Sequence, residues 1–259
     1  MIRELRTADE VRAACGDDDL LVWAAQGLRG GARAWALGEA VVAGCPGLSR
    51  ADRLGVWGEA SGAIELVRHA LAELGPSYRP FGELELVREV TAKLDGLLQE
   101  RGRFSWMSLD AAPVQGAPQV PGGGGSAEGR DGGAVRWLDG GEEAEVAGLL
   151  AADAPASYAV PGLAGVRRWA GVRVDGELAA VAADAWSAPE VGLLAGVATR
   201  ARFRGRGLGG LVCRWVSAEL VAAYGRAALM VDDDNAPALA LYGRLGYRRR
   251  RVVATHVVS

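Results

Sequence analysis

The stretch from Arg204 to Gly210 holds the residues best suited to chemistry. Its glycines let the backbone turn sharply and approach a ligand closely. A helical pattern follows up to Tyr224, and the first N–H groups of such a helix point into the loop with the positive end of its dipole. Charge is added by Arg200, Arg202, Arg204 and Arg206. This combination is typical of a site for a phosphate or pyrophosphate group.

A dinucleotide site is one interpretation of these glycines. Gly205-x-Gly207-x-x-Gly210 fits the dinucleotide fingerprint, and Asp232 lies about 20 residues further on, at the end of an apolar run. In such a turn, however, the strand runs almost directly into the first glycine. Here the polar stretch 200–204 intervenes, deep in the last third of the chain. A nicotinamide-dependent oxidoreductase is therefore the less favoured alternative.

Two motifs in order carry a resemblance to the GNAT superfamily of N-acetyltransferases. The first is Arg204-Gly205-Arg206-Gly207-Leu208-Gly209, preceded by a strand that ends in Val197-Ala198-Thr199. The second runs from Asn235 to Tyr247 and resembles the pattern Asn-x-x-Ala-x-x-Leu-Tyr-x-x-Leu-Gly-Tyr. The resemblance implies acetyl-CoA as co-substrate and direct attack by a primary amine in a ternary complex. Whether acetyl or a longer acyl group is transferred stays open.

The resemblance also implies roles for single residues. The coenzyme would be held by Val197, Ala198, Thr199, Arg202, Arg204, Gly205, Arg206, Gly207, Leu208, Gly209, Gly210, Asn235 and Tyr242. Tyr242 would protonate the departing thiolate as general acid. Taken without the glycine loop, Tyr242 is better explained as a core aromatic of a helix that Asn235 caps and Gly246 ends; with both motifs present, the catalytic role is favoured. A non-catalytic acyl-CoA-binding regulatory module is therefore the alternative within the same fold.

The general base is less well defined. Acetyl transfer needs a deprotonated amine, and the family often uses a glutamate near the strand before the glycine loop. Glu190, at the start of that strand, is the candidate, with Asp184 and Glu177 as weaker ones. Each is also readable as a solvated surface charge. The resemblance places the oxyanion on a backbone N–H between Gly196 and Ala198.

Composition limits the class of protein. The net charge of −3 argues against a general nucleic-acid binder, and no apolar run is long enough to span a membrane. Three cysteines and two histidines show no metal-ligand spacing, so we expect no metal. Arginine is used almost to the exclusion of lysine, which is typical of a GC-rich bacterial genome. We expect a cytoplasmic monomer or homodimer that acts on a small-molecule or peptide amine.

A Gly/Pro-rich linker at 111–133 divides the chain into an N-terminal α/β domain, 1–110, and a catalytic domain, 134–259. The predicted class is α/β (α+β), a GNAT fold with a mixed central sheet flanked by helices. In the catalytic domain we expect helices at 142–153, 158–168, 208–224 and 236–245. The expected strands are a hairpin turning at Asp175-Gly176, then 191–199, 227–232 and a last strand, 247–258, that closes the sheet.

The N-terminal domain is less clearly patterned. We expect strands or buried runs at 20–26, 33–42, 53–59 and 104–109, and helices at 63–74 and 84–100. This order echoes the second domain, so a degenerate, cofactor-free copy of the same fold is one interpretation and an unrelated α/β domain the other. The stretch 58–62 lacks the arginines and spacing of a phosphate loop. An acceptor pocket could include Trp137, Trp169, Trp186 or Trp215, although each is also readable as core.

Overall fold

The computed structural model describes residues 1–94, 96–111 and 133–258. Nearly all of the predicted linker, 111–133, lies outside the described residues. The first half contains, in chain order, β1 (Arg3–Leu5), α1 (Ala8–Ala14), α2 (Asp19–Ala25), β2 (Arg33–Leu37), β3 (Ala40–Cys45), β4 (Arg53–Trp57), α3 (Ala60–Leu74), β5 (Arg79–Glu83), α4 (Leu84–Lys93) and β6 (Leu98–Leu109). The second half contains β7 (Arg136–Trp137), α5 (Glu143–Asp153), β8 (Val166–Val174), β9 (Glu177–Ala185), β10 (Gly192–Thr199), α6 (Leu208–Tyr224), β11 (Ala227–Asp232), α7 (Ala236–Arg244) and β12 (Arg248–Val257).

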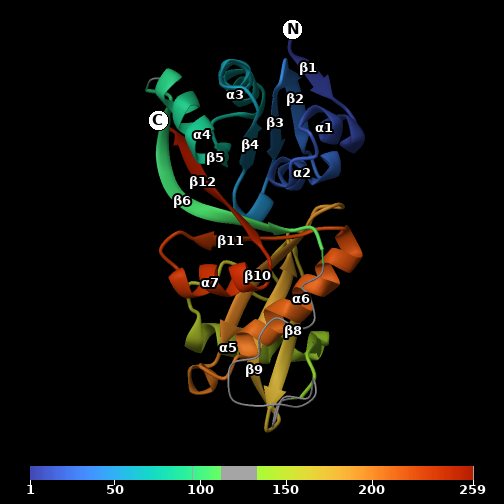
Figure 1. Cartoon of the computed structure of the whole chain (residues 1–259). Helices are drawn as coiled ribbons and strands as arrows, with labels where there is room; N and C mark the ends of the chain where they lie inside the picture. The colour runs from blue at the N-terminus through green and yellow to red at the C-terminus, as the bar shows by residue number, and fades with distance from the viewer. Residues whose placement is uncertain (95, 112–132, 259) are drawn as a thin grey trace.

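One mixed sheet runs through both halves. Its 12 strands have the order β1-β2-β3-β4-β5-β12-β6-β11-β10-β9-β8-β7. Two neighbouring pairs are parallel, β4 with β5 and β10 with β11, and the others are antiparallel. Each parallel pair is joined by one helix, α3 in the first half and α6 in the second. The two halves therefore repeat the same arrangement (Figure 1).

The halves exchange strands at the centre of the sheet. β6 belongs to the first half in sequence but pairs with β11, where Met107 lies opposite Leu229. β12 belongs to the second half but pairs with β5, where Val253 lies opposite Gly82. β6 and β12 also pair with each other, and both cross between the halves (Figure 1). The prediction that the last strand closes its own domain's sheet is therefore wrong, because an apolar strand pattern does not specify the partner strand.

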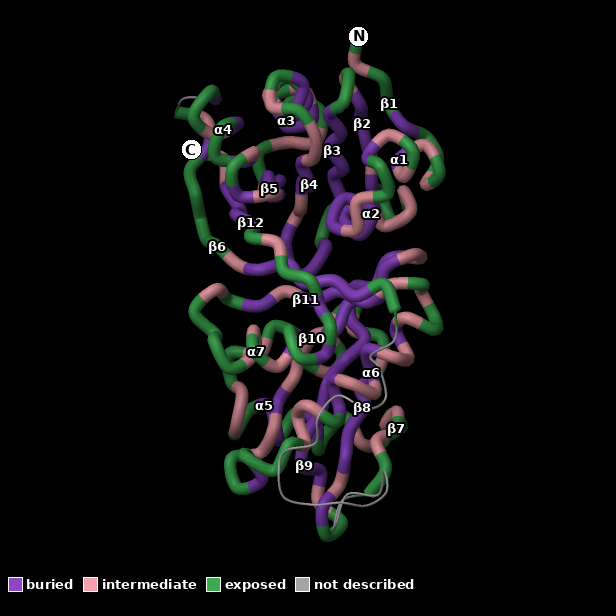
Figure 2. Tube along the Cα trace, viewed as in Figure 1, coloured by how far each residue is buried: buried purple, intermediate pink, exposed green. Residues whose placement is uncertain are grey.

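Three apolar cores hold the helices on the sheet. One lies between the sheet and α3 and α4, and another between the sheet and α6 and α7. The third is continuous across the junction: it combines α1 and α2 of the first half with α5 and the segment after it in the second half. Buried residues accordingly run without a break from one half into the other (Figure 2). In the described part of the chain, no helix has the length and apolarity needed to cross a membrane.

Four expected elements differ from the structure. The run 33–42 is not one strand but contains β2 and the start of β3, which turn at Gly38, where φ is +57°. The run 20–26 is helix α2, whose apolar residues are buried all round; a short apolar run does not by itself distinguish a strand from a buried helix. The segment 158–168 is not a helix, because Pro161 and the positive φ of Gly162 and Gly165 interrupt it before β8 begins. The helix expected at 84–100 ends at Lys93, and Leu98 already belongs to β6.

Candidate functional site

The phosphate loop predicted from the sequence lies between β10 and α6. Gly205 and Gly207 have φ values of +78° and +80°, the left-handed region that favours glycine. A Cβ at either position would meet nothing within 4 Å, so the surface above the loop is open. Gly207 is the N-cap of α6, and no side chain caps this helix. The N–H groups of Leu208, Gly209 and Gly210 in its first turn therefore remain available to an anion.

The arginines of the loop are partly engaged within the chain. Arg200 and Arg202 both form ion pairs with Glu177. Arg204 donates to the main-chain oxygens of Thr199 and Asp153, at 3.2 and 2.9 Å. These bonds fix the loop and offset part of its positive charge. They also occupy Glu177, one of the weaker base candidates.

Arg206 differs from the other arginines of the loop. The guanidinium of Arg206 lies 5.5 Å from the ring centroid of Phe203, and Arg206 is exposed to solvent. Among the described residues no carboxylate lies within 4.0 Å of it. Arg206 can therefore meet a ligand phosphate without first breaking an ion pair.

The strands β10 and β11 separate beside the loop. They pair only between Gly192–Leu194 and Ala227–Leu229, although both strands continue beyond these residues. In β10 a bulge lies between Ala195 and Ala198, where Gly196 has a φ of +61°. The main chain of Val197, Ala198 and Thr199 thus has no strand partner on the β11 side. An unpaired strand edge offers N–H and C=O groups to an extended ligand.

Trp169 and Ala159 close the bulge from the face that carries α5. A methyl group at Gly196 would collide with the indole of Trp169, and it would lie 3.3 Å from the Cβ of Ala159. Glycine is therefore required here both by the backbone conformation and by space. Sequence reasoning did not single out Gly196 for this reason, because the neighbours that fill the space come from other strands and loops.

Tyr242 lies on α7, which begins as predicted. The side chain of Asn235 accepts from the N–H of Ala238 at 3.2 Å, and Gly246, with φ +94°, follows the helix. Tyr242 is 6% exposed, and its ring lies 5.8 Å from that of Tyr247. Burial, with the Cys213 thiol bonded to its hydroxyl, raises the pKa of Tyr242 well above its ordinary value. The hydroxyl is therefore neutral and packed in the core beneath α6.

The base candidates lie away from the bulge or are engaged. Asp184 is fully buried and accepts from the Ser187 and Tyr224 hydroxyls at 2.5 and 2.8 Å, and it is ion-paired with Arg168. These contacts indicate that Asp184 has a structural role. Glu190 lies in the turn before β10, at the opposite end of this strand from the phosphate loop.

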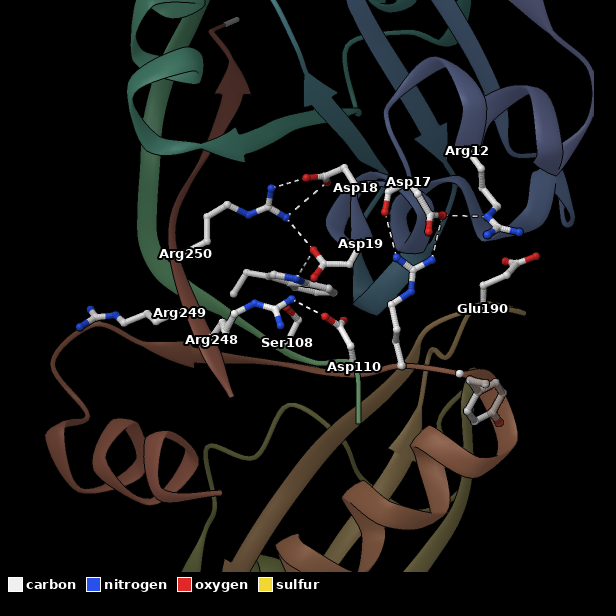
Figure 3. Close-up of a pocket in the computed structure, with 14 residues that line it drawn as sticks. Arg12, Asp17, Asp18, Asp19, Ser108, Asp110, Glu190, Arg248, Arg249 and Arg250 are labelled. Carbon is white, nitrogen blue, oxygen red and sulfur yellow. Dashed lines mark hydrogen bonds and ion pairs between the residues drawn. The ribbon is translucent and has the colours of Figure 1, made fainter. Parts of the chain in front are cut away.

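Glu190 lines a cleft of about 830 Å³ between the two halves (Figure 3). Ion pairs cross this cleft: Arg226 with Asp17, and Arg250 with Asp18 and Asp19. They join the second half and its exchanged strand to the loop between α1 and α2. Because these arginines and aspartates neutralise each other, we interpret the cleft as part of the junction between the halves.

The first half has a helix in the position of α6, but its N-terminus is closed. Glu59 caps α3, and its carboxylate accepts from the N–H groups of Ser61 and Gly62 at 2.7 and 3.1 Å. These are the groups that would bind a phosphate. The sequence predicts no phosphate loop at 58–62, and in the structure the Glu59 carboxylate occupies the N–H groups that such a loop would offer. Sequence reasoning missed the role of Glu59, because the usual helix caps are serine, threonine, aspartate and asparagine rather than glutamate.

Residues of both motifs belong to one apolar cluster, which contains Val197, Leu208 and Tyr242. The open end of α6, the unpaired edge of β10 and the helix with Tyr242 all adjoin one another on the side of the sheet that α6 and α7 cover.

The four tryptophans considered for an acceptor pocket pack within the protein. Trp186 and Trp169 are buried, at 6% and 3%, while Trp137 and Trp215 pack on each other with ring centroids 5.2 Å apart.

Comparisons with known proteins agree with this arrangement. Residues 171–256, which include the bulge, the loop and Tyr242, match the family model of FR47-like proteins. No curated protein matches the sequence.

Three of the solved structures that resemble this chain cover nearly its whole length. The GCN5-related N-acetyltransferase from Kribbella flavida is 20% identical, with a TM-score of 0.58 over 92% of this chain and 95% of that one. The GCN5-related N-acetyltransferase from Sphaerobacter thermophilus is 15% identical, with a TM-score of 0.57 over 100% and 95%. A tandem GNAT protein from the clavulanic acid biosynthesis pathway is 15% identical, with a TM-score of 0.54 over 99% and 98%.

At these identities the likeness shows a common fold. It confirms the predicted GNAT fold and favours the degenerate copy over an unrelated first domain. The chain is therefore a tandem GNAT-fold protein, and its second half carries the match to the FR47-like proteins.

Proposed function

We propose that the second half is an acetyl-CoA-dependent N-acetyltransferase that acts on a primary amine in a ternary complex. One contrast within the chain carries this proposal. The N-terminus of α6 is uncapped and lies beside a separated pair of strands, whereas the N-terminus of α3 is filled by the Glu59 carboxylate. One half is built to receive an anionic ligand and the other is closed to it.

The open half offers two kinds of contact to coenzyme A. The diphosphate would accept hydrogen bonds from the N–H groups between Gly205 and Gly210, with Arg206 adding a charge-assisted bond. The amides of the pantetheine arm would bind the free edge of β10 at Val197–Thr199, in the way that an added strand binds a sheet edge. The thioester would then lie near the bulge at Gly196.

The chemistry is acyl transfer without a metal or covalent enzyme intermediate. The amine nitrogen attacks the thioester carbonyl, and the carbonyl oxygen becomes an oxyanion that a main-chain N–H of the bulge stabilises. When the intermediate collapses, the C–S bond breaks, and the thiolate takes a proton from Tyr242. Glu190 precedes Gly196 by six residues, up to about 20 Å of extended chain. We therefore assign the proton lost by the amine to solvent rather than to Glu190.

A non-catalytic acyl-CoA-binding module is the second candidate, and one observation favours it. The hydroxyl of Tyr242 is buried on the Cys213 thiol, and its raised pKa makes it a weak proton donor in this conformation. Such a module would use the same loop and strand edge but release no coenzyme A. The two candidates therefore differ in turnover and agree in binding.

Turnover in Tyr242→Phe distinguishes the two candidates. We expect the variant to bind acetyl-CoA as the wild type does, while kcat for coenzyme A release falls by about 10²-fold or more, the usual contribution of a general acid. Tyr247→Phe is the matched control, because it removes an equally buried hydroxyl, bonded to Ser217, from the neighbouring ring. The measurement is thiol release with a panel of amines. Absence of turnover in the wild type with every amine would favour the binding module.

A further inference from the structure

Tyr158 joins the two halves on the face of the sheet that carries α5. It is 45% exposed and belongs to the segment between α5 and β8. Arg50 of the first half donates to the main-chain oxygen of Tyr158 at 3.4 Å, and its guanidinium lies 5.0 Å from the ring centroid. Arg53 donates to the Tyr158 hydroxyl at 3.5 Å. The first half thus places two arginines on a surface segment of the second half.

These arginines belong to a larger group of positive charges, which we call the arginine cluster: Arg50, Arg53, Arg79 and Arg101. Arg79 lies directly opposite Arg53 in the parallel pair of β4 and β5. Burial, and then the positive charges of Arg79 and Arg101, lower the pKa of Arg53. Within the described ranges, no carboxylate lies within 4.0 Å of any member of the cluster.

Such an arrangement is unfavourable without a ligand. Like charges directly opposite each other on neighbouring strands destabilise a sheet, and a partly buried guanidinium needs an anion to offset its desolvation. Elsewhere in the described part of the chain, arginines such as Arg33, Arg173 and Arg226 have carboxylate partners. Arg53 of the arginine cluster instead donates only to neutral acceptors, the main-chain oxygens of Leu48 and Ser49 and the Tyr158 hydroxyl, so no anion among the described residues offsets its charge.

The arginine cluster is close to the proposed reaction centre. Tyr158 is followed by Ala159, which packs on the bulge residue Gly196. Since neighbouring Cα atoms are about 3.8 Å apart, a group bound beside the Tyr158 ring lies on the order of 10 Å from the bulge. The arginines of the first half therefore contact the segment of the second half that packs on the bulge, on the face opposite α6 and α7.

Two buried polar atoms near this connection lack partners. The Nε1–H of Trp169, whose ring touches Gly196, and the Oγ of Ser49, next to Arg50, have no hydrogen-bond partner among the described residues. Trp169 and Ser49 are 3% and 1% exposed. Ser49 and Arg50 also have positive φ values of +50° and +64°, an uncommon conformation for residues other than glycine. Unpaired buried polar atoms are rare in folded proteins, and backbone strain of this kind is concentrated at functional sites.

We propose that the arginine cluster binds a carboxylate or phosphate group of the acceptor, so that the preferred acceptor is an amine that also carries an anion. The first half is then the domain that recognises the acceptor, while the second half holds acetyl-CoA. This inference rests on the proposed acetyltransferase function. It predicts that Arg53 governs acceptor binding and leaves the affinity for acetyl-CoA unchanged.

The test uses probes that differ only in the anion. The full chain, saturated with coenzyme A so that the phosphate loop is occupied, is titrated with 6-aminohexanoate, 8-aminooctanoate and the corresponding alkylamines. Inorganic phosphate serves as a minimal anion, and ligand-induced thermal stabilisation at constant ionic strength is the readout. Arg53→Gln is compared with Arg68→Gln, which removes an exposed charge from α3 in the same half.

We expect the aminocarboxylates to bind the wild type and Arg68→Gln better than the alkylamines do. In Arg53→Gln their apparent Kd rises about tenfold, the loss of roughly one charge-assisted hydrogen bond. If Arg53→Gln does not fold, the exposed Arg50→Gln shows the same change in reduced size. The proposal is overturned if no anionic probe stabilises the wild type, if alkylamines bind equally well, or if both arginine variants leave aminocarboxylate binding unchanged.

Direct titration with acetyl-CoA separates the two proposals. An equal weakening of acetyl-CoA binding in Arg53→Gln would assign the arginine cluster to the coenzyme and overturn the inference. If the wild type binds no acetyl-CoA, the proposed function fails. Phosphate binding that is lost in Arg53→Gln and kept in Arg206→Gln would then still identify an anion site at the arginine cluster.

Discussion

At the scale of single residues, the sequence identified the groups of the second half that carry a local signature. Gly205 and Gly207 adopt the positive φ expected of a ligand-binding loop, and Asn235 caps its helix. Residues whose importance depends on packing could not be found in this way. Nothing local marks Arg53 as a residue that reaches Tyr158, because the two lie 105 positions apart in the chain.

Glu142 shows how a single carboxylate can stabilise the second half. Hydrogen bonds from Arg136 and Arg173 lower the pKa of Glu142 to about 2, from an ordinary value of 4.5. These bonds connect β7, the turn before α5, and β8. Because the pKa is depressed in the folded state, the stabilisation is present above the unfolded value and is lost as the pH falls through the folded one.

We expect Glu142→Gln to lower the urea midpoint of unfolding at pH 6, since the ion pairs are then complete in the wild type. The difference between the two proteins should shrink as the pH falls from about 4.5 towards 2. Glu143→Gln, which removes a neighbouring exposed charge, is the control. A difference between wild type and Glu142→Gln that stays constant over this pH range would contradict the assignment.

At the scale of elements, periodicity predicted the second half well. The hairpin at Asp175-Gly176, the strand before the loop and helices α6 and α7 lie where the patterns place them. Helix α2 was missed because an all-round apolar run carries no period. The pattern of the last strand was correct, but its position between β5 and β6 depends on pairing across the whole sheet.

The N-termini of α3 and α6 distinguish the two halves. Glu59 supplies the cap of α3, so Glu59→Ala should lower the urea midpoint of unfolding, because two N–H groups of the first turn lose their acceptor. Acetyl-CoA affinity should not change, because this helix lies in the closed half. Urea unfolding and calorimetric titration check the two expectations.

The control is Glu83→Ala, which removes the corresponding cap of α4. A second molecule of acetyl-CoA bound by Glu59→Ala alone would show that the carboxylate blocks an otherwise complete site.

At the scale of the whole molecule, the exchange of β6 and β12 makes the halves interdependent. Each half of the sheet contains a strand supplied by the other half of the sequence, and one apolar core spans the junction. The ion pairs of the cleft in Figure 3 reinforce the same contact. The described part of the chain is therefore one structural unit, although its two halves repeat the same arrangement of strands and helices, and we propose that only the second half binds acetyl-CoA.

Calorimetric titration of the full chain with acetyl-CoA tests this claim most directly. We predict one molecule bound per chain, with an affinity at least about tenfold weaker in Gly210→Asp, which adds a carboxylate to the first turn of α6, where the new Cβ would lie 3.2 Å from Leu241 Cδ1. Gly210→Asn is matched in size but uncharged and should bind much more like the wild type. Two molecules bound per chain, or equal affinities in Gly210→Asp and Gly210→Asn, would contradict the account. Binding of NAD(H) in place of acetyl-CoA would identify the loop as a dinucleotide site.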